Sequence, residues 1–395
     1  MRRRFWVVGG AVLAVVVVVV GVVVLVGGGL SREVTLDVAA PEPDSVDVVF
    51  GGDDTAYVSY FADRRHRVVA IRAGADEPLW TTAFADLDTV QLAMTDGVLL
   101  MLTDCTPGCD TMVALDPGTG KTRWTTKISV PQVLGVSGGR LVVHTAANSV
   151  YTGVAALDPR SGRVAWRFGD GRDRFALVPG TTRLAHYDAT GTLRLVDVAT
   201  GRATEAVDVP AYQDGESTLS ATDSVVVLSL ETGSSVHDAG DLTELWTAEG
   251  LIHPVRDDRF YRGGVVTDDR GRELWRTEER IFRTAPDAAW GYTQTYEARD
   301  RYRTNYVDLT TGDVLTDGWN TPVHTAPDGV LEVDSHGIGT NVGTGTSLDL
   351  WYVELPTGDR TDLGTLDVYR ESCEFGATHL VCLDTDGQLG MWSYR

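Results

Sequence analysis

A turn motif that returns at nearly regular intervals constrains the fold of this chain more than any other feature. In its clearest copy, Asp116-Pro117-Gly118-Thr119-Gly120, an apolar segment runs into the turn, a glycine closes it, and Trp124 follows four residues later. The other copies keep some or all of the acidic residue, the closing glycine and the tryptophan: Asp158, Gly162 and Trp166; Asp197 and Gly201; Trp246; Gly271 and Trp275; Asp308, Gly312 and Trp319; and Gly358.

The spacing of these copies indicates a unit of roughly propeller-blade length. The closing glycines at 120, 162 and 201 are 42 and 39 residues apart, and those at 271, 312 and 358 are 41 and 46 residues apart. Such a period is typical of blades made of four strands. In each turn the aspartate can accept a hydrogen bond from the backbone ahead of it. One blade cannot cover both of its faces, so blades stacked around a ring bury them against one another.

Short apolar runs between the turns supply the strands of these units. Examples are residues 98–102, 225–228 and 379–383, and no helical period rises above the background after the first 30 residues. Counting the turns gives eight or nine units, of which the first and the last look incomplete. We therefore predict an all-β propeller over residues 46–395, with eight blades as the favoured number and seven as the alternative.

The repeated glycine and tryptophan resemble the pyrroloquinoline-quinone-type (PQQ-like) propeller repeat over residues 46–395. In that family the two residues dock neighbouring blades together, which implies the same role for Gly120, Trp124 and their counterparts. The pattern is similar to the non-enzymatic, extracytoplasmic members, including the lipoprotein propeller of the outer-membrane β-barrel assembly machine. That lipoprotein is anchored through a cysteine, and this chain has none near its N-terminus. The resemblance is specific for fold and less so for function, because propellers carry many unrelated activities.

An apolar run near the N-terminus predicts a membrane anchor. Residues 1–4 include three arginines, and residues 5–30 form a run of 26 residues without a charge. About 20 apolar residues suffice to cross a bilayer, whereas the apolar core of a cleaved signal peptide is usually about 7–15 residues long. No Ala-x-Ala site follows the run, so we favour an uncleaved helix. The arginines then place residues 1–4 in the cytoplasm and the rest outside the cell membrane, as a single-pass protein.

Two interpretations of residues 31–45 stay open. Pro41 and Pro43, with scattered acidic residues, suit a short linker. The stretch Val34-Thr35-Leu36-Asp37-Val38 instead suits a strand that joins the last blade and closes the ring.

The four cysteines suit two local disulfides in the oxidising space outside the membrane. Cys105 and Cys109 flank a Thr-Pro-Gly turn, and Cys373 and Cys382 flank the start of the last strand pair. Four cysteines allow three pairings, and this one joins the nearest partners. A zinc site is the alternative, but the spacing is not Cys-x2-Cys and no histidine motif accompanies it.

No catalytic constellation emerges from the sequence. A quinone-dependent dehydrogenase of the resembling family would be longer and would hold its cofactor against a disulfide of adjacent cysteines, which this chain lacks. The nucleophile-elbow, phosphate-loop and zinc-protease motifs are also missing. The acidic turn at Asp384 has no glutamate at the twelfth position of a calcium loop. His144, His186 and His379 lie in strand patterns, where we expect packed or edge residues. We therefore expect a protein without enzymatic activity, cofactor or metal.

The net charge of −22 narrows the range of partners. Such an acidic chain disfavours nucleic acid and anionic membrane surfaces. Our favoured hypothesis is a membrane-anchored, extracytoplasmic propeller that binds an envelope or secreted protein as a scaffold, in envelope assembly or secretion. The alternatives are an extracytoplasmic enzyme, quinone-dependent or glycan-active, and a sensor that binds a small ligand in the propeller channel.

Overall fold

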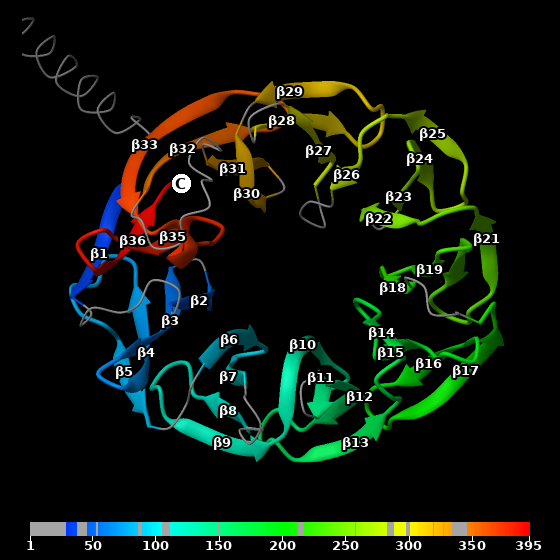
Figure 1. The fold of residues 1–395 in the computed structure, drawn as a ribbon, viewed down its shortest axis with the longest axis horizontal. Coiled ribbons are helices and arrows are strands. Elements are labelled where there is room, and N and C mark those ends of the chain that lie inside the picture. Colours follow the sequence, from blue (N-terminus) through cyan, green and yellow to red (C-terminus); the bar gives the residue numbers. More distant parts are fainter. Residues whose placement is uncertain are drawn as a thin grey trace, which may run out of the picture.

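A ring of small antiparallel sheets makes up the protein. The computed structural model describes residues 29–37, 46–52, 54–85, 89–104, 111–147, 150–211, 217–256, 258–282, 288–297, 301–318, 320–326, 328–333 and 346–395. Within these ranges, 36 strands form nine four-stranded sheets arranged around one axis, each sheet being a blade (Figure 1). The all-β propeller that the sequence predicts is therefore confirmed.

Blades 1 to 8 each consist of four consecutive strands, the first innermost and the fourth outermost. Blades 1 to 4 comprise β2 (Asp47–Phe50), β3 (Thr55–Ala62), β4 (Arg65–Arg72) and β5 (Trp80–Phe84); β6 (Thr89–Thr95), β7 (Val98–Asp104), β8 (Thr111–Leu115) and β9 (Thr122–Lys127); β10 (Ser129–Ser137), β11 (Arg140–Ala147), β12 (Val150–Leu157) and β13 (Val164–Phe168); and β14 (Arg174–Leu177), β15 (Arg183–Tyr187), β16 (Thr192–Asp197) and β17 (Arg202–Asp208).

The second half of the chain continues the same order. Blades 5 to 8 comprise β18 (Ser217–Ala221), β19 (Val225–Leu230), β20 (Gly233–Asp238) and β21 (Glu244–Ala248); β22 (His253–Arg256), β23 (Arg259–Arg262), β24 (Val265–Asp268) and β25 (Glu273–Arg276); β26 (Ile281–Phe282), β27 (Trp290–Glu297), β28 (Arg301–Asp308) and β29 (Val314–Gly318); and β30 (Thr321–Ala326), β31 (Gly329–Val333), β32 (Thr346–Glu354) and β33 (Arg360–Val368).

Blade 9 joins the two ends of the described chain. The 3₁₀ turn η3 (Arg370–Ser372) leads into β34 (Glu374–Phe375), β35 (His379–Leu383) and β36 (Gln388–Ser393), and β1 (Ser31–Asp37) is the outermost strand. β1 pairs antiparallel with β36, from Ser31 opposite Ser393 to Asp37 opposite Gln388. Of the two interpretations of residues 31–45, the structure thus contains the ring-closing strand.

The predicted number of blades is wrong, since the described residues form nine blades and not eight or seven. The prediction treated the first and last units as parts of one blade. In the structure blade 1 has four strands of its own, and blade 9 has three of its own and borrows only β1. Each incomplete-looking unit is therefore a separate blade.

The core consists of apolar layers between neighbouring blades. In the described residues there are nine buried clusters, and each one spans one interface of the ring. The second and third strands of a blade are covered on both sides, so they read as continuous apolar runs such as the fully buried Val225–Leu230. The outermost strands have one exposed side and alternate, as in Val164–Phe168.

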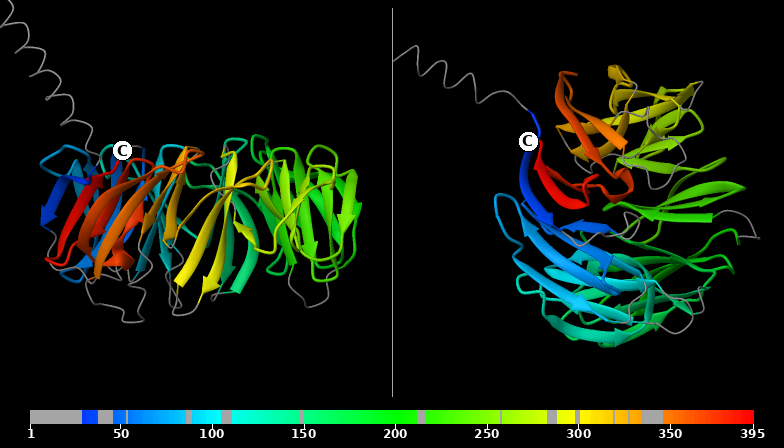
Figure 2. Two further views of the ribbon diagram at one scale, coloured as in Figure 1. Left: turned by 90° about the horizontal axis from the view of Figure 1, so that it is seen from above. Right: turned by 60° about the vertical axis from the view of Figure 1, so that its left-hand side comes forward.

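Strand direction gives the ring two different faces. Turns between the first and second strands and between the third and fourth strands of each blade lie on one side, called here the turn face. Turns between the second and third strands, and the connections from blade to blade, lie on the other side, the loop face. β36 is a third strand and ends on the turn face, where the C-terminus lies (Figure 2, left). β1 is a fourth strand and begins there, so Leu30 also lies on the turn face.

The predicted cytoplasmic residues 1–4 and most of the predicted anchor, residues 5–30, lie outside the described residues. Among the residues that the structure describes, none belongs to a helix with the length and apolar character that a bilayer crossing requires.

Candidate functional site

The predicted repeat residues lie at contacts between neighbouring blades on the turn face. At five interfaces of the described chain, a tryptophan on the outermost strand donates its indole N–H to a carbonyl in the next blade. These pairs are Trp80 and Pro117 (2.8 Å), Trp124 and Pro159 (2.9 Å), Trp166 and Val198 (2.9 Å), Trp246 and Asp269 (2.9 Å), and Trp275 and Leu309 (3.3 Å). A Cβ atom at the closing glycine would collide with the indole at Gly120, Gly162, Gly201, Gly271 and Gly312.

The turn aspartates hold the turns that receive these tryptophans. Oδ1 of Asp158 accepts a hydrogen bond from the Arg160 amide at 2.8 Å, and Oδ1 of Asp116 accepts one from the Gly118 amide at 3.1 Å. Asp197 and Asp308 accept bonds of the same kind. Hydrogen bonds from the Arg123 and Thr119 side chains lower the pKa of Asp116 below its ordinary value. The repeat motif therefore builds the ring.

Two of the other four interfaces show what stands in place of the tryptophan. On β17, Glu205 lies opposite Leu195, at the register position that the tryptophan occupies in other blades. In the turn between β20 and β21 of the next blade, Leu242 replaces the closing glycine and has a φ of +61°. Leu242 is buried, because no indole occupies the space that its side chain fills. On β29 Thr316 takes the tryptophan position and contacts Gly358, while Trp319 lies outside the described residues.

A buried ionic network occupies the interface between blades 7 and 8. Glu332 on β31 is fully buried, and its Oε2 accepts hydrogen bonds from Arg360 at 2.7 Å and from Asn320 at 3.2 Å. Its Oε1 accepts the hydroxyl of Tyr306 at 2.5 Å. Burial, together with the Glu332 charge, raises the pKa of Tyr306 well above its usual range. These partners satisfy the carboxylate inside the ring.

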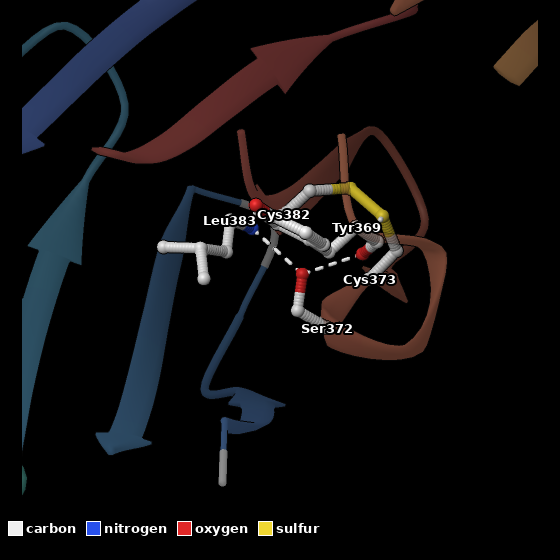
Figure 3. The surroundings of a disulfide bond; sticks show 5 residues. All are labelled: Tyr369, Ser372, Cys373, Cys382 and Leu383. Carbon is white, nitrogen blue, oxygen red and sulfur yellow. Dashed lines mark hydrogen bonds between the residues drawn. A yellow bond between two sulfur atoms is a disulfide. The ribbon is translucent and has the colours of Figure 1, made fainter. Parts of the chain in front are cut away.

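One of the two predicted disulfides lies in the described chain. Cys373 and Cys382 are bonded, as predicted, and join the segment after η3 to β35 within blade 9. Beside the bond, the hydroxyl of Ser372 donates to the Tyr369 carbonyl at 2.6 Å and accepts the Leu383 amide at 2.9 Å (Figure 3). The bond thus fixes the blade that closes the ring. Cys105 and Cys109 lie outside the described residues.

A polar cavity opens between blades 3 and 4 on the loop face. Its volume is about 210 Å³, and its walls come from β10, β11, β12, β14, β18 and the connection between β13 and β14. The polar residues that line it are Gln132, His144, Tyr151, Asp170, Asp173 and Arg174. This cavity brings charged and aromatic side chains together on the loop face, and we take it as the candidate site.

Asp173, which lines this cavity, is paired with the buried His186. Oδ2 of Asp173 lies 2.8 Å from Nε2 of His186, with 7% and 2% of the two side chains exposed. The same oxygen accepts the Asp170 amide at 2.9 Å. Phe175 stacks on the His186 ring with the centroids 5.0 Å apart. Burial lowers the pKa of His186 below its ordinary value, although Asp173 opposes the shift, so the imidazole is neutral near pH 7.

The remaining walls are held by Arg174 and His144. Arg174 donates through Nε to the Ser217 carbonyl at 3.0 Å and through a terminal nitrogen to the Arg172 carbonyl at 2.9 Å. His144 lies edge-on to Tyr151, with ring centroids 5.5 Å apart, and burial lowers its pKa as well. Tyr151 is 47% exposed, so it reaches from the cavity to the surface.

A second cavity lies on the turn face of blade 8. It has a volume of about 500 Å³ and is lined by Tyr352, Leu363, Tyr394 and Arg395, among others. Burial raises the pKa of Tyr352 to about 12. The Leu30 amide donates to the Leu363 carbonyl at 3.0 Å, so this cavity lies beside the point where the chain enters β1.

The sequence predicted three packed or edge histidines but gave no sign of the acidic residues of the candidate site. His186 and His379 are buried and His144 is half-buried, as expected of packed strand residues. Asp170 and Asp173 read as a polar turn, Gly169-Asp170-Gly171-Arg172-Asp173, and no spacing rule connects them to His186. No cluster of three or more potential metal ligands occurs within the described ranges.

Comparisons with known proteins agree with this architecture. Residues 64–236 match the sequence model of a family described as outer membrane protein assembly factor BamB. A eukaryotic initiation factor shares 11% identity, with 87% of this chain and 94% of that chain covered and a TM-score of 0.59. The computationally designed Ika8 protein shares 13% identity over 92% and 99% of the two chains, with a TM-score of 0.51. BamB from Moraxella catarrhalis shares 14% identity over 92% and 97%, with a TM-score of 0.46.

A search of curated proteins finds no match to the chain. The likeness to the solved structures concerns the fold. The family match confirms the predicted resemblance to the PQQ-like propeller repeat.

Proposed function

We propose that this propeller of PQQ-like repeats is a membrane-anchored, extracytoplasmic scaffold that binds protein partners in envelope assembly or secretion. The observation that carries the proposal is the match of residues 64–236 to the family of an outer membrane assembly factor. The disulfide between Cys373 and Cys382 supports an oxidising location outside the cytoplasm. The family match supports the coarser role, protein binding by a propeller, and the anchor and the process are proposed beyond it.

The position of Leu30 gives the scaffold an orientation. Residues 5–30 are the proposed span, and Ser31 already begins β1 on the turn face. The Leu30 amide is bonded to the Leu363 carbonyl of blade 8, so no free linker separates the proposed span from the ring. The turn face then lies against the membrane, and the loop face points away from it, toward partners.

The loop face carries surface features suited to a protein partner. Val150 is 64% exposed and Tyr151 is 47% exposed, and the two are consecutive residues at the start of β12. Tyrosine is enriched at protein interfaces, where its ring provides contact area and its hydroxyl a hydrogen bond. The net charge of −22 favours basic partners and disfavours nucleic acid.

Crosslinking of the full-length protein in its native membrane, followed by mass spectrometry, tests the proposal. We expect a stoichiometric envelope or secretion protein, lost with Val150→Asp on the loop face. The matched control is Val314→Asp, because Val314 is 59% exposed on the outer strand β29. If no protein copurifies in stoichiometric amount, the scaffold role is refuted. Release of the protein by alkaline carbonate washing would refute the anchor.

We further propose that the scaffold acts without a quinone cofactor. Quinone stacking requires an exposed aromatic face, whereas the indoles of Trp124 and Trp166 cover the closing glycines of the next blades. The one disulfide of the described residues joins Cys373 and Cys382 inside blade 9, and they are not adjacent in sequence. The residues present therefore do not fit this cofactor. Incubation of the purified protein with pyrroloquinoline quinone and calcium, then gel filtration, tests this: a retained quinone absorbance would contradict it.

A further inference from the structure

We propose that the cavity between blades 3 and 4 receives an arginine side chain of the protein partner. This inference rests on the proposed scaffold function and names the chemistry by which the loop face would recognise its partner. It depends on the acidic groups, the aromatic wall and the size of the cavity.

Two carboxylates of the cavity retain acceptor capacity. Asp173 uses Oδ2 for His186 Nε2 and the Asp170 amide, at 2.8 and 2.9 Å, while its Oδ1 has no hydrogen-bond donor in the part of the chain that the structure describes. The side chain is only 7% exposed and lines the cavity. Asp170 accepts the Arg172 amide through Oδ1 at 2.8 Å and lines the same cavity. A guanidinium group, with five N–H donors in a planar fork, matches two such acceptors.

The guanidinium of Arg174, which lines the cavity, is hydrogen-bonded to backbone carbonyls. Arg174 donates to the carbonyls of Ser217 and Arg172, which fix the guanidinium at the wall between β14 and β18. The imidazole of His186 is neutral near pH 7, since burial lowers its pKa. Asp170 and Asp173 therefore leave the lining with an excess of negative charge, which favours a cationic ligand.

The aromatic wall and the volume favour arginine over a larger ligand. Tyr151 and Phe175 line the cavity. Because the Phe175 ring is already stacked on His186, the half-exposed Tyr151 ring is the one that can attract a guanidinium through its face. The volume of about 210 Å³ is below the roughly 300–1,000 Å³ of pockets for drug-sized ligands, so it suits a single side chain.

Ligand-observed NMR on the full-length protein in nanodiscs tests the inference. The probes are N-acetyl-arginine methylamide and its uncharged isostere N-acetyl-citrulline methylamide, with methyl glucoside as a neutral polyhydroxylated ligand. We expect the arginine probe to bind with a Kd of about 1–10 mM, as befits one side chain, and the other two not to bind. Equal binding of arginine and citrulline, or preferential binding of the glucoside, would overturn the inference.

Two variants locate the binding. Asp170→Asn keeps the acceptor for the Arg172 amide but removes the charge, and we expect arginine binding to weaken about tenfold. Asp158→Asn is the matched control, because Asp158 accepts the Arg160 amide in the same way, at 2.8 Å, on the opposite face. An unchanged affinity in Asp170→Asn, or an equal loss in Asp158→Asn, would place the probe elsewhere and refute the site.

The same variants separate this inference from the scaffold function. A partner that crosslinks to the wild-type protein and equally to Asp170→Asn would refute the arginine site while the scaffold role stands. Arginine binding that depends on Asp170, with no protein partner recovered, would refute the scaffold role and leave the site as one for a free cationic ligand.

Discussion

Replacement of Gly162 by alanine tests whether the docking of Trp124 stabilises the ring. Gly162 has a φ of +66° and closes the turn of blade 3 that receives this tryptophan. An added Cβ atom would lie 2.7 Å from Cδ2 of Trp124 and would also collide with the Thr126 hydroxyl. The indole must move, and its hydrogen bond to the Pro159 carbonyl is lost.

The expected loss of unfolding free energy has three parts. The left-handed backbone costs about 1–2 kcal/mol for a residue with a Cβ atom. Overpacking against the indole costs about 1–3 kcal/mol, and the lost hydrogen bond about 1 kcal/mol. Gly162→Ala should therefore cost about 3–6 kcal/mol. Gly139 lies in the same blade with a φ of +68° and nothing within 4 Å of an added Cβ, so Gly139→Ala should cost only the backbone part, about 1–2 kcal/mol.

Denaturant unfolding, followed by tryptophan fluorescence and circular dichroism, measures both values. A Trp124→Ala background completes the test, because removal of the indole leaves Gly162→Ala with only the backbone cost and the contact with the Thr126 hydroxyl. The difference between the two backgrounds isolates the contact. Equal costs for Gly162→Ala and Gly139→Ala, or the same cost for Gly162→Ala with and without Trp124, would refute the docking argument.

Three further predictions concern other parts of the ring. Glu332→Ala should lower the unfolding free energy by about 3 kcal/mol, because it leaves buried donors of the network between blades 7 and 8 without an acceptor. The double variant Cys373→Ala, Cys382→Ala should lower the unfolding free energy by about 2–3 kcal/mol, because without the disulfide the unfolded chain gains conformational entropy. Burial lowers the pKa of His144 and His186, so the unfolded chain binds more protons and stability should fall as the pH drops from 7 through about 6.5.

Each of these three predictions would be contradicted by a specific result of the stability measurements. A loss for Glu332→Ala below 1 kcal/mol, the usual range of an exposed ion pair, would mean that the network is not buried in solution. An unchanged denaturation midpoint in the double cysteine variant under oxidising conditions would contradict the role of the disulfide. A stability that is constant from pH 7 to 5, or that rises, would contradict neutral buried histidines. His186→Asn should reduce the pH slope, which tests the assignment.

The architecture could be predicted from the sequence because one local rule is repeated. The Asp turn, the closing glycine and the tryptophan each have a fixed geometric task, so Gly120, Gly162 and Gly201 mark successive blades directly. The ring-closing alternative for residues 31–45 came from the alternating pattern of Val34 to Val38. The number of blades could not be predicted in the same way, because blade 9 lacks a covalent turn between its third and fourth strands.

Features that depend on contacts between blades were not accessible to sequence reasoning. A register shift follows the turn in strand pairs such as β8–β9 and β12–β13, but nothing in Ala114 or Ala156 indicates it. Leu242 departs from the glycine rule because Glu205, in the preceding blade, removes the indole. The candidate site has the same origin, since Asp173 and His186 become neighbours only when β14 and β15 stand side by side.

The closure of blade 9 also determines when the ring can be completed during synthesis. Arg32 and Asp384, which form an ion pair across β1 and blade 9, are 352 residues apart in the chain. Contacts between residues so far apart in sequence form late in folding, because the chain must lose the entropy of loop closure before the contact contributes any stabilising energy. β1 therefore emerges from the ribosome first and waits for the last strand made, with its edge unpaired. During that interval a second nascent copy can offer the same strand, so exchange of β1 between copies competes with closure of a single ring.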